Sequence, residues 1–336
     1  MNHILKLNQN KIFEKKTILI TGGTGSFGNH ITKILLKNFN PKKIIIFSRD
    51  EFKQYCMKKK INIYNEKIRY FLGDIRDYNR LLEAFRNVDI IFHAAALKQV
   101  DSIEYNPLEA IKTNVYGTEN VVRAAIERNV ERVIGISTDK SVCPVNLYGA
   151  TKLCLEKIII GGNIMGGNTT KFSVLRYGNV MASRGSVIPL FKKQKEKGIL
   201  TVTHKEMTRF TLTLDEAINF VLNCTDKMIG GEIFVPKLPS YGIVQLARVI
   251  APKAEIKIVG IRPGEKIHES MISPHESYKS LDCGDYYIIM SKLALLEKFQ
   301  NHPDFHFKCK EGFEYNSNSN PLMEDSKLRN LIDNLS

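Results

Sequence analysis

The chain has 336 residues, of which 43% are apolar and 25% are charged, and its excess of lysine and arginine gives a net charge of +14. No apolar run approaches the roughly 18 residues that cross a bilayer, and no signal peptide is evident, so we expect a cytoplasmic protein without a membrane partner. Six scattered cysteines without a CxxC pair, and histidines without an HExxH pair, argue against a disulfide framework and against a bound metal.

Short β-branched runs alternate with helix-length stretches through the first half of the chain. Buried strands that alternate with helices predict a parallel sheet covered on both faces, which is a Rossmann-like, doubly wound α/β fold. The predicted strands lie at residues 16–21, 42–48, 68–74, 88–96, 130–138 and 171–180.

This alternation ends after residue 180. Residues 186–198 predict a helix, residues 209–225 a strand that leads into a helix, and residues 230–237 a return to the sheet. The remaining sequence mixes short strands and helices, with a polar break at residues 316–321 before a last helix. We therefore predict an NADP-binding Rossmann domain of residues 14–180 and 205–237, and a smaller, discontinuous α/β domain of residues 181–204 and 238–336 that binds the substrate.

A glycine-rich turn, "TGGTGSFG", connects the first predicted strand to the first helix. Gly22, Gly25 and Gly28 stand where a dinucleotide-binding fold needs a tight turn, close backbone approach to a pyrophosphate and close helix–strand packing. The free N–H groups at the start of the helix favour the anion. The spacing is GxxGxxG rather than GxGxxG, but the strand before it and the helix after it favour cofactor binding.

The end of the second predicted strand, "FSRDE", bears on the choice of cofactor. An acidic residue at this point is typical of NAD binding, whereas an arginine accommodates the 2′-phosphate of NADP. Arg49 comes before Asp50, so we favour NADP over NAD, although Ser48 or Asp50 could instead cap the next helix. Other predicted cofactor contacts are Thr21, Thr24, Ser26, Phe27, Lys53, Asp74, Ile75, Ala94, Ala95, Ala96 and Lys98.

Tyr148 and Lys152 are four residues apart, which places them on one face of a helix. A tyrosine ordinarily has a pKa of about 10, and lowering it to about 7 takes roughly 4 kcal/mol. An ammonium group at ~4 Å supplies about that much at an effective dielectric constant of ~20. We therefore predict that Lys152 activates Tyr148 as a catalytic base beside the cofactor.

These features together resemble the extended short-chain dehydrogenase/reductase superfamily. Within it, the sequence is most similar to the inverting UDP-N-acetylglucosamine 4,6-dehydratases of pseudaminic acid biosynthesis. The resemblance runs from about Lys16 to His275, and the stretches that carry it include "SRDE", "HAAALK", "EYNPLEAIKTN", "STDK", "NLYGATK", "RYGNV", "SRGSV", "MTRF", "GGEIFVPK" and "RPGEKIHE".

The resemblance implies oxidation of the sugar at C4, loss of water across C5–C6 and return of the hydride to C6 by a recycled cofactor. Tyr148 takes the O4 proton, with Thr138 as a positioning or relay group. Asp139 is then the acid at O6 and Lys140 the base at C5, although the two could also be a simple surface ion pair worth about 0–1 kcal/mol. Similar retaining dehydratases carry Asp-Glu where this chain has Asp139 and Lys140.

The resemblance also implies contacts with UDP-N-acetylglucosamine. A diphosphate favours arginine and backbone donors. The residues that match substrate contacts of the family are Lys98, Thr138, Tyr177, Asn179, Arg209, Arg262 and Glu265. Members of the family assemble as homo-oligomers, so we expect a dimer or a hexamer.

Three other functions stay open at this point. A UDP-sugar 4-epimerase needs Tyr148 and Lys152 but has no use for the acid–base pair, and a retaining 4,6-dehydratase lacks the lysine. A non-catalytic NADP-sensing or nucleic-acid-binding regulator would fit the net charge of +14. We disfavour the regulator because both Tyr148 and Lys152 are intact, and we predict no nucleic-acid partner.

Overall fold

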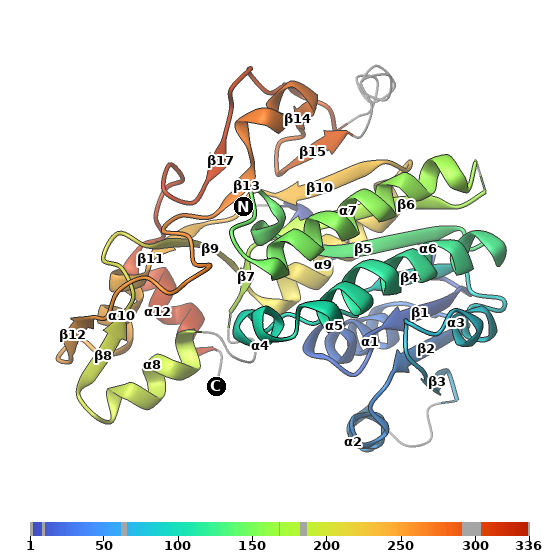
Figure 1. Cartoon of the computed structure of the whole chain (residues 1–336), viewed down its shortest axis with the longest axis horizontal. Coiled ribbons are helices and arrows are strands. Elements are labelled where there is room, and N and C mark those ends of the chain that lie inside the picture. The colour runs from blue at the N-terminus through green and yellow to red at the C-terminus, as the bar shows by residue number, and fades with distance from the viewer. Residues whose placement is uncertain are drawn as a thin grey trace.

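The computed structural model describes residues 3–8, 11–61, 66–167, 169–181, 187–290 and 304–334. All structural statements below concern these residues. Most of the "SRGSV" stretch, which contributed to the resemblance, lies outside them. The described part divides into a large lobe built on one sheet and a smaller lobe beside it, on the left of Figure 1.

The large lobe is built on a ten-stranded sheet with the order β16-β14-β15-β10-β6-β5-β4-β1-β2-β3. Its seven strands from β10 to β3 run parallel to one another. Strand order reverses on either side of β1, as in a doubly wound sheet, so the predicted Rossmann-like fold is confirmed. The parallel strands are β1 (Thr17–Thr21), β2 (Lys43–Ser48), β3 (Ile68–Leu72), β4 (Ile90–His93), β5 (Arg132–Thr138), β6 (Lys171–Tyr177) and β10 (Glu232–Pro236).

Three antiparallel strands extend the sheet beyond β10. They are β14 (Ser280–Asp282), β15 (Tyr286–Met290) and β16 (Phe307–Lys308). All five residues of β15 are buried, so this strand covers the edge that β10 would otherwise expose. These strands belong to the large sheet, whereas the predicted domain boundary assigns their residues to the substrate domain.

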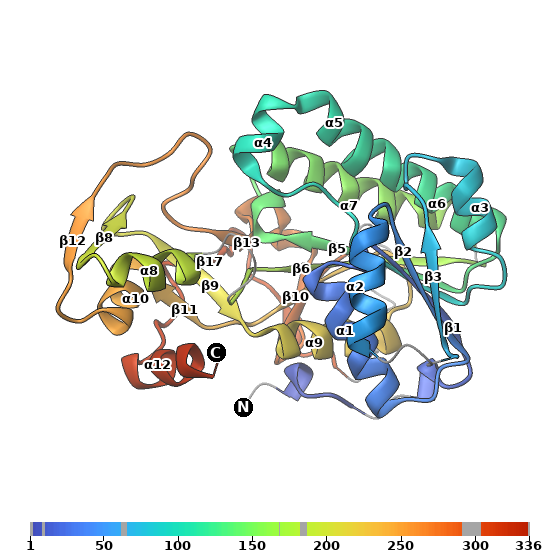
Figure 2. The same cartoon turned by 90° about the horizontal axis from the view of Figure 1, so that it is seen from below.

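Helices cover both faces of the sheet, as Figure 2 shows. One face carries α3 (Tyr78–Ala84), α6 (Gly117–Glu127) and α7 (Leu147–Met165), with α4 (Val100–Tyr105), α5 (Pro107–Ile111) and the π-helical turn η3 (Lys112–Tyr116) outside them. The other face carries α1 (Ser26–Asn38) and α9 (Leu214–Lys227), with α2 (Glu51–Ile61) at its edge and the short 3-10 helices η1 (His3–Leu5) and η2 (Lys11–Phe13) nearby. Thr213 caps α9 through a capping box with Glu216, which fixes where that helix begins.

The small lobe has a hydrophobic core of its own, in which Phe191, Leu200 and Leu246 are fully buried. A three-stranded sheet, β11-β9-β7, and two pairs, β12-β8 and β13-β17, build it with three helices. The strands are β7 (Asn179–Val180), β8 (Ile199–Val202), β9 (Thr208–Leu212), β11 (Ser240–Gly242), β12 (Glu255–Ile258), β13 (Ser270–Ile272) and β17 (Tyr315–Asn316). The helices are α8 (Val187–Lys195), α10 (Ile243–Ile250) and α12 (Asp325–Asp333), and η5 (Pro274–Lys279) is a 3-10 helix beside the large sheet.

No helix among the described residues combines the length and apolar character that crossing a membrane requires. All six cysteines are described and carry free thiols, which agrees with the expectation of no disulfide framework.

Candidate active site

The glycine turn between β1 and α1 brings the backbone close to the chain that follows β4. Gly22 has a φ of +64°, and a Cβ atom there would lie 2.9 Å from the backbone nitrogen of Ala95. A Cβ atom on Gly28 would lie 2.2 Å from the carbonyl oxygen of Gly23. Gly25 is the N-cap of α1, and no side chain in the described structure caps this helix. The first N–H groups of α1 therefore stay available to an anion.

A cavity of about 220 Å³ opens beside this turn, at the carboxyl ends of β1, β2, β3 and β4. Ten of the predicted cofactor contacts line it: Gly22, Thr24, Ser48, Arg49, Asp50, Lys53, Asp74, Ile75, Ala95 and Ala96. Three lining residues, Phe47, Gly73 and Thr113, were not predicted. The other predicted cofactor contacts do not line it: Thr21, Gly25, Ser26, Phe27, Gly28, Ala94, Lys98 and also Tyr148 and Lys152.

The rim of this cavity is charged. Asp50 accepts a hydrogen bond from the backbone N–H of Lys53 and pairs with the Lys53 ammonium group at 2.8 Å, so it caps α2. The Arg49 guanidinium lies 3.5 Å from Asp74 and is half exposed. Burial alone would raise the pKa of Asp74, but hydrogen bonds from Arg76 and the charge of Arg49 lower it. Both residues line the cavity and both are paired, Asp50 with Lys53 at 2.8 Å and Arg49 with Asp74 at the longer distance of 3.5 Å.

A buried histidine, which sequence reasoning missed, ties β1 to the strand beside it. His93 Nδ1 lies 2.8 Å from Thr21 Oγ1, and His93 Nε2 lies 3.0 Å from Thr118 Oγ1. Burial first, and then the charge of Lys152, lowers the pKa of His93 to about 3. His93 therefore stays neutral, and its role is to hold the strand ends that flank the cavity.

The predicted acid–base pair lies directly after β5. Lys140 Nζ is 3.0 Å from Asp139 Oδ1 and 3.1 Å from Asn179 Oδ1, while the Thr138 hydroxyl donates to Asp139 Oδ1 at 2.8 Å. Asp139 is fully buried, and its Oδ2 has no hydrogen-bond partner among the described residues. The alternative of a surface ion pair is therefore wrong, because one partner is inaccessible to solvent.

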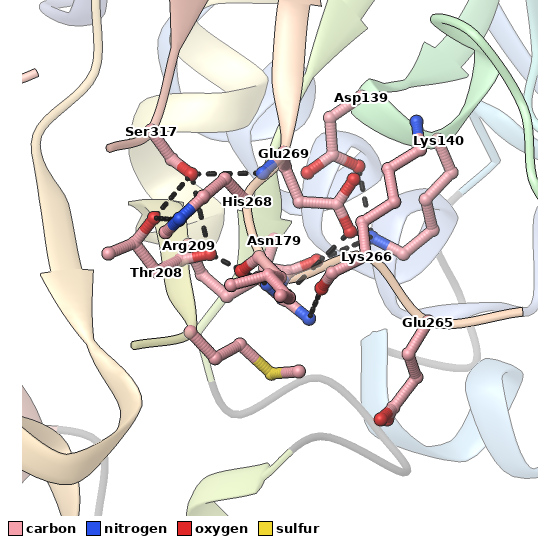
Figure 3. Close-up of polar contacts among 12 residues, drawn as sticks. Asp139, Lys140, Asn179, Thr208, Arg209, Glu265, Lys266, His268, Glu269 and Ser317 are labelled. Atoms are coloured by element: carbon pink, nitrogen blue, oxygen red, sulfur yellow. Dashed lines mark hydrogen bonds and ion pairs between the residues drawn. The ribbon is translucent and has the colours of Figure 1, made fainter. Parts of the chain in front are cut away.

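A second carboxylate, Glu269, reaches the same lysine from the small lobe (Figure 3). Its Oε1 lies 3.4 Å from Lys140 Nζ and 3.9 Å from Arg209 Nε. Burial alone would lower the pKa of Lys140, but the charges of Asp139 and then Glu269 raise it well above its ordinary value. Sequence reasoning missed Glu269, although it is the last residue of the "RPGEKIHE" stretch.

The sequence predicts that the Lys152 ammonium group lowers the pKa of the Tyr148 phenol, and the structure differs from this. Burial raises the pKa of Tyr148 to about 12, while the charge of Lys140 and a hydrogen bond with Thr138 act to lower it. Lys152 Nζ donates instead to the carbonyl oxygen of Ile136 at 2.5 Å. Burial also lowers the pKa of Lys152, to about 8. The cation that acts on Tyr148 in this structure is thus Lys140.

The predicted substrate contacts fall into two groups. Tyr177 and Asn179 lie at the end of β6 and in β7, close to the acid–base pair, and Arg209 is buried beside Glu269 with its guanidinium donating to three backbone carbonyl groups. Arg262 is mostly exposed and pairs with Glu265 at 3.4 Å, and Glu265 points away from Lys140 in Figure 3. Burial lowers the pKa of Lys98, which makes no side-chain contact described here with either group.

A buried ion pair braces the loop that carries Asp139 and Lys140. Glu156 accepts hydrogen bonds from the hydroxyl groups of Ser137 and Ser141, each at 2.6 Å. Arg176 donates to Glu156 at 2.6 Å and also to Glu276 in η5 at 3.0 Å. Both sides of the loop are therefore fixed to α7 and β6, and sequence reasoning identified none of these braces.

This architecture is that of the extended short-chain dehydrogenase/reductases. In addition to the cofactor cavity, it has a polar site where the two lobes meet, at which Asp139 and Glu269 both face Lys140. Residues 18–291 match the model of a family described as polysaccharide biosynthesis protein, and the chain belongs to that family. The predicted resemblance is confirmed by relatives that cover nearly the whole chain.

One relative is a UDP-N-acetylglucosamine 4,6-dehydratase (inverting) from Campylobacter jejuni, which is 48% identical over 94% of this chain and 96% of its own length. Another is a UDP-glucose 4-epimerase from Rickettsia bellii, which is 43% identical over 94% of this chain and 99% of its own length. Among solved structures, Pen from Bacillus thuringiensis matches with a TM-score of 0.87 and 38% identity, over 97% of this chain and 99% of its own.

Proposed function

We propose that this protein is an inverting UDP-N-acetylglucosamine 4,6-dehydratase. The observation that carries the proposal is the buried Asp139–Lys140 pair, which lies beside Tyr148 at the carboxyl end of β5. A dehydratase needs one group to take a proton from C5 and another to give a proton to the departing C6 hydroxyl. A 4-epimerase needs neither. The similarity to the Campylobacter dehydratase over nearly the full chain supports the same function.

The cavity at the glycine turn fits a nicotinamide dinucleotide. Gly22 and Gly28 allow the turn to pack tightly against the chain after β4 and against α1, and the uncapped start of α1 suits the pyrophosphate. We assign the cofactor as NADP because Arg49, directly after β2, lines the cavity and is half exposed, while Asp50 is engaged by Lys53. When bound, the cofactor would supply a reversible hydride acceptor for the oxidation at C4 and the reduction at C6.

Tyr148, Thr138 and Lys152 act at the C4 hydroxyl. In the resting site the Tyr148 phenol is protonated, and the Lys140 charge together with the Thr138 hydrogen bond favours its ionised form. Tyr148 first releases its phenolic proton to solvent, and the phenolate then accepts the O4 proton as the ketone forms, while Thr138 holds the hydroxyl. Lys152 lies four residues after Tyr148 on the same helix and is buried, which lowers its pKa to about 8.

Asp139 and Lys140 then act on C5 and C6. The 4-ketone acidifies the C5 proton because the resulting carbanion is an enolate, so a base of ordinary strength suffices. One member of the pair accepts that proton, and the other protonates O6 as water leaves. Asn179 and Tyr177 hold the sugar beside the pair, and Lys98, Arg209, Arg262 and Glu265 are the candidate contacts for the nucleotide part. The homo-oligomer and the cytoplasmic location stay predictions.

Incubation with UDP-N-acetylglucosamine in deuterated water, followed by proton NMR, tests the proposal. We expect a C6 methyl group, deuterium at C5 and the couplings of the L-arabino 4-keto sugar. The D-xylo product would mean a retaining dehydratase. A galacto-configured product with an intact C6 hydroxyl, from this sugar or from UDP-glucose, would mean a 4-epimerase, as the name of the Rickettsia relative allows. An unchanged spectrum with saturable binding would favour a regulator.

A further inference from the structure

Glu269 is a buried carboxylate that the proposed chemistry does not use. It stands just before β13 in the small lobe and is 2% exposed. Its Oε1 lies 3.4 Å from Lys140 Nζ, and its Oε2 has no hydrogen-bond partner among the described residues. An ionised carboxylate is costly to bury unless a cation compensates it. Packing alone therefore gives no reason for a glutamate here.

The charged groups around Lys140 balance. Its ammonium group faces Asp139 on the same loop and Glu269 from the small lobe, and Arg209 on β9 faces Glu269. Two cations thus match two carboxylates. The other groups near Lys140 are uncharged in the resting state: Asn179, Tyr148 and Tyr241, whose phenols have raised pKa values because they are buried. Without Glu269, one positive charge would have no counterpart.

We infer that Glu269 is a positioning residue that holds Lys140 as an ammonium ion, so that Lys140 donates the proton to the departing C6 hydroxyl. This inference rests on the proposed function. The C5–H bond breaks and its proton passes to the Asp139 carboxylate, while the C5–C6 double bond forms. The C6–O bond breaks, and O6 leaves as water with the Lys140 proton. Proton transfer from Asp139 to Lys140 over 3.0 Å then restores the pair.

The opposite division of roles, with Asp139 as the acid and Lys140 as the base, follows from the sequence resemblance. It requires Lys140 to lose its proton before the reaction, against the attraction of two carboxylates. In the division inferred here, both groups already carry the charge that their role needs. Glu269 therefore promotes the reaction when Lys140 is the acid and opposes it when Lys140 is the base. Because removing the Glu269 charge changes activity in opposite directions in the two cases, an experiment can distinguish the two assignments.

The test compares the pH dependence of kcat in the parent protein, Glu269→Gln and Glu269→Asp. Glutamine keeps the shape and removes the charge. Because a charge within ~4–6 Å shifts a pKa by about 1–3 pH units, we expect Glu269→Gln to lose activity on the basic side about 1–3 pH units lower than the parent. Glu269→Asp keeps the charge at a greater distance from Lys140. The pH at which its activity is lost on the basic side should therefore also fall, but by less.

A second readout separates loss of elimination from general damage. Where dehydration slows but C4 oxidation continues, the near-ultraviolet absorbance of reduced nicotinamide rises during turnover, and we expect this rise in Glu269→Gln. The matched control is Glu314→Gln, since Glu314 is an exposed partner of Ser270 on the neighbouring strand, and it should behave like the parent in both measurements.

Three results would overturn the inference. They are a higher activity of Glu269→Gln at neutral pH, an unchanged pH dependence of Glu269→Gln, or a loss of activity of Glu269→Asp at a higher pH than in the parent. The aspartate variant keeps the test decisive if the glutamine variant does not fold. A parent protein that fails to dehydrate UDP-N-acetylglucosamine would refute the proposed function itself. If the parent dehydrates this sugar nucleotide and the variants have the same pH dependence of kcat as the parent, only the role of Glu269 is refuted.

Discussion

Replacing Lys152 with methionine should make the protein more stable while it abolishes activity. Lys152 is 4% exposed, and burial lowers its pKa from 10.5 to about 8. The gap between these two pKa values corresponds to about 3 kcal/mol, which the folded state loses by keeping the charged lysine buried. Methionine has nearly the same shape and carries no charge. The hydrogen bond to the Ile136 carbonyl is lost, at about 1 kcal/mol, so the net gain near pH 7 is about 2 kcal/mol.

The sign of the pH dependence follows from the lowered pKa. Below about pH 8, Lys152 is charged in both the folded and the unfolded chain, and the full cost of burial is present. Between about pH 8 and 10.5 the folded chain has released the proton while the unfolded chain still holds it, so the parent gains stability as the pH rises. The methionine variant lacks this gain. Its advantage should therefore shrink through this window, and near pH 10.5 the parent should be the more stable protein by about 1 kcal/mol, the contribution of the hydrogen bond.

Urea unfolding of both proteins, freed of nucleotide, measures the difference at several pH values between about 7 and 10.5. Other titrating groups are shared and cancel in the comparison. Lys157, an exposed lysine on the same helix, provides the control, because Lys157→Met removes a lysine without removing a buried charge. If Lys152→Met is no more stable than the parent near pH 7, or if its advantage does not fall with rising pH, the charge on buried Lys152 is not what limits stability.

Three further substitutions probe the cavity and its supports. Gly28→Ala places a Cβ atom 2.2 Å from the Gly23 carbonyl oxygen and should cost about 1–3 kcal/mol, measured by thermal unfolding, together with a loss of nucleotide binding by calorimetry. Arg176→Met leaves Glu156 buried without its cation and should cost about 3–5 kcal/mol in urea unfolding. Arg49→Ala should raise the Kd for NADP about tenfold and leave that for NAD unchanged; equal effects on both would refute the choice of NADP.

The parallel sheet and the cofactor cavity could be predicted because their signals are local. Runs such as 44–47 and 133–136 contain no polar side chain, as is typical of strands buried on both faces. The glycines of the turn are required by contacts at the first strand–helix connection, where the chain can take few paths. Ten of the predicted cofactor contacts share one cavity for this reason, since carboxyl ends of neighbouring parallel strands meet at one edge of the sheet.

The contacts of the small lobe could not be predicted in the same way. Glu269 meets Lys140 because β13 is held against the 3-10 turn η4 (Asp139–Ser141) by the packing of distant segments, and no spacing along the chain predicts that contact. The Arg176–Glu276 contact also joins segments far apart in the sequence. For β15, the place in the large sheet follows from pairing with β10, which a local sequence pattern does not specify.

The acid–base site therefore draws its charges from both lobes. The large lobe supplies Asp139 and Lys140, and the small lobe supplies Glu269 and Arg209. Each carboxylate that faces Lys140 raises the pKa of its ammonium group. Arg176 on β6 bonds to Glu276 of η5 and so ties the segment that follows β13 to the large sheet on the buried side. Glu269 thus helps to set the protonation state of Lys140 from a segment that is distant in the sequence.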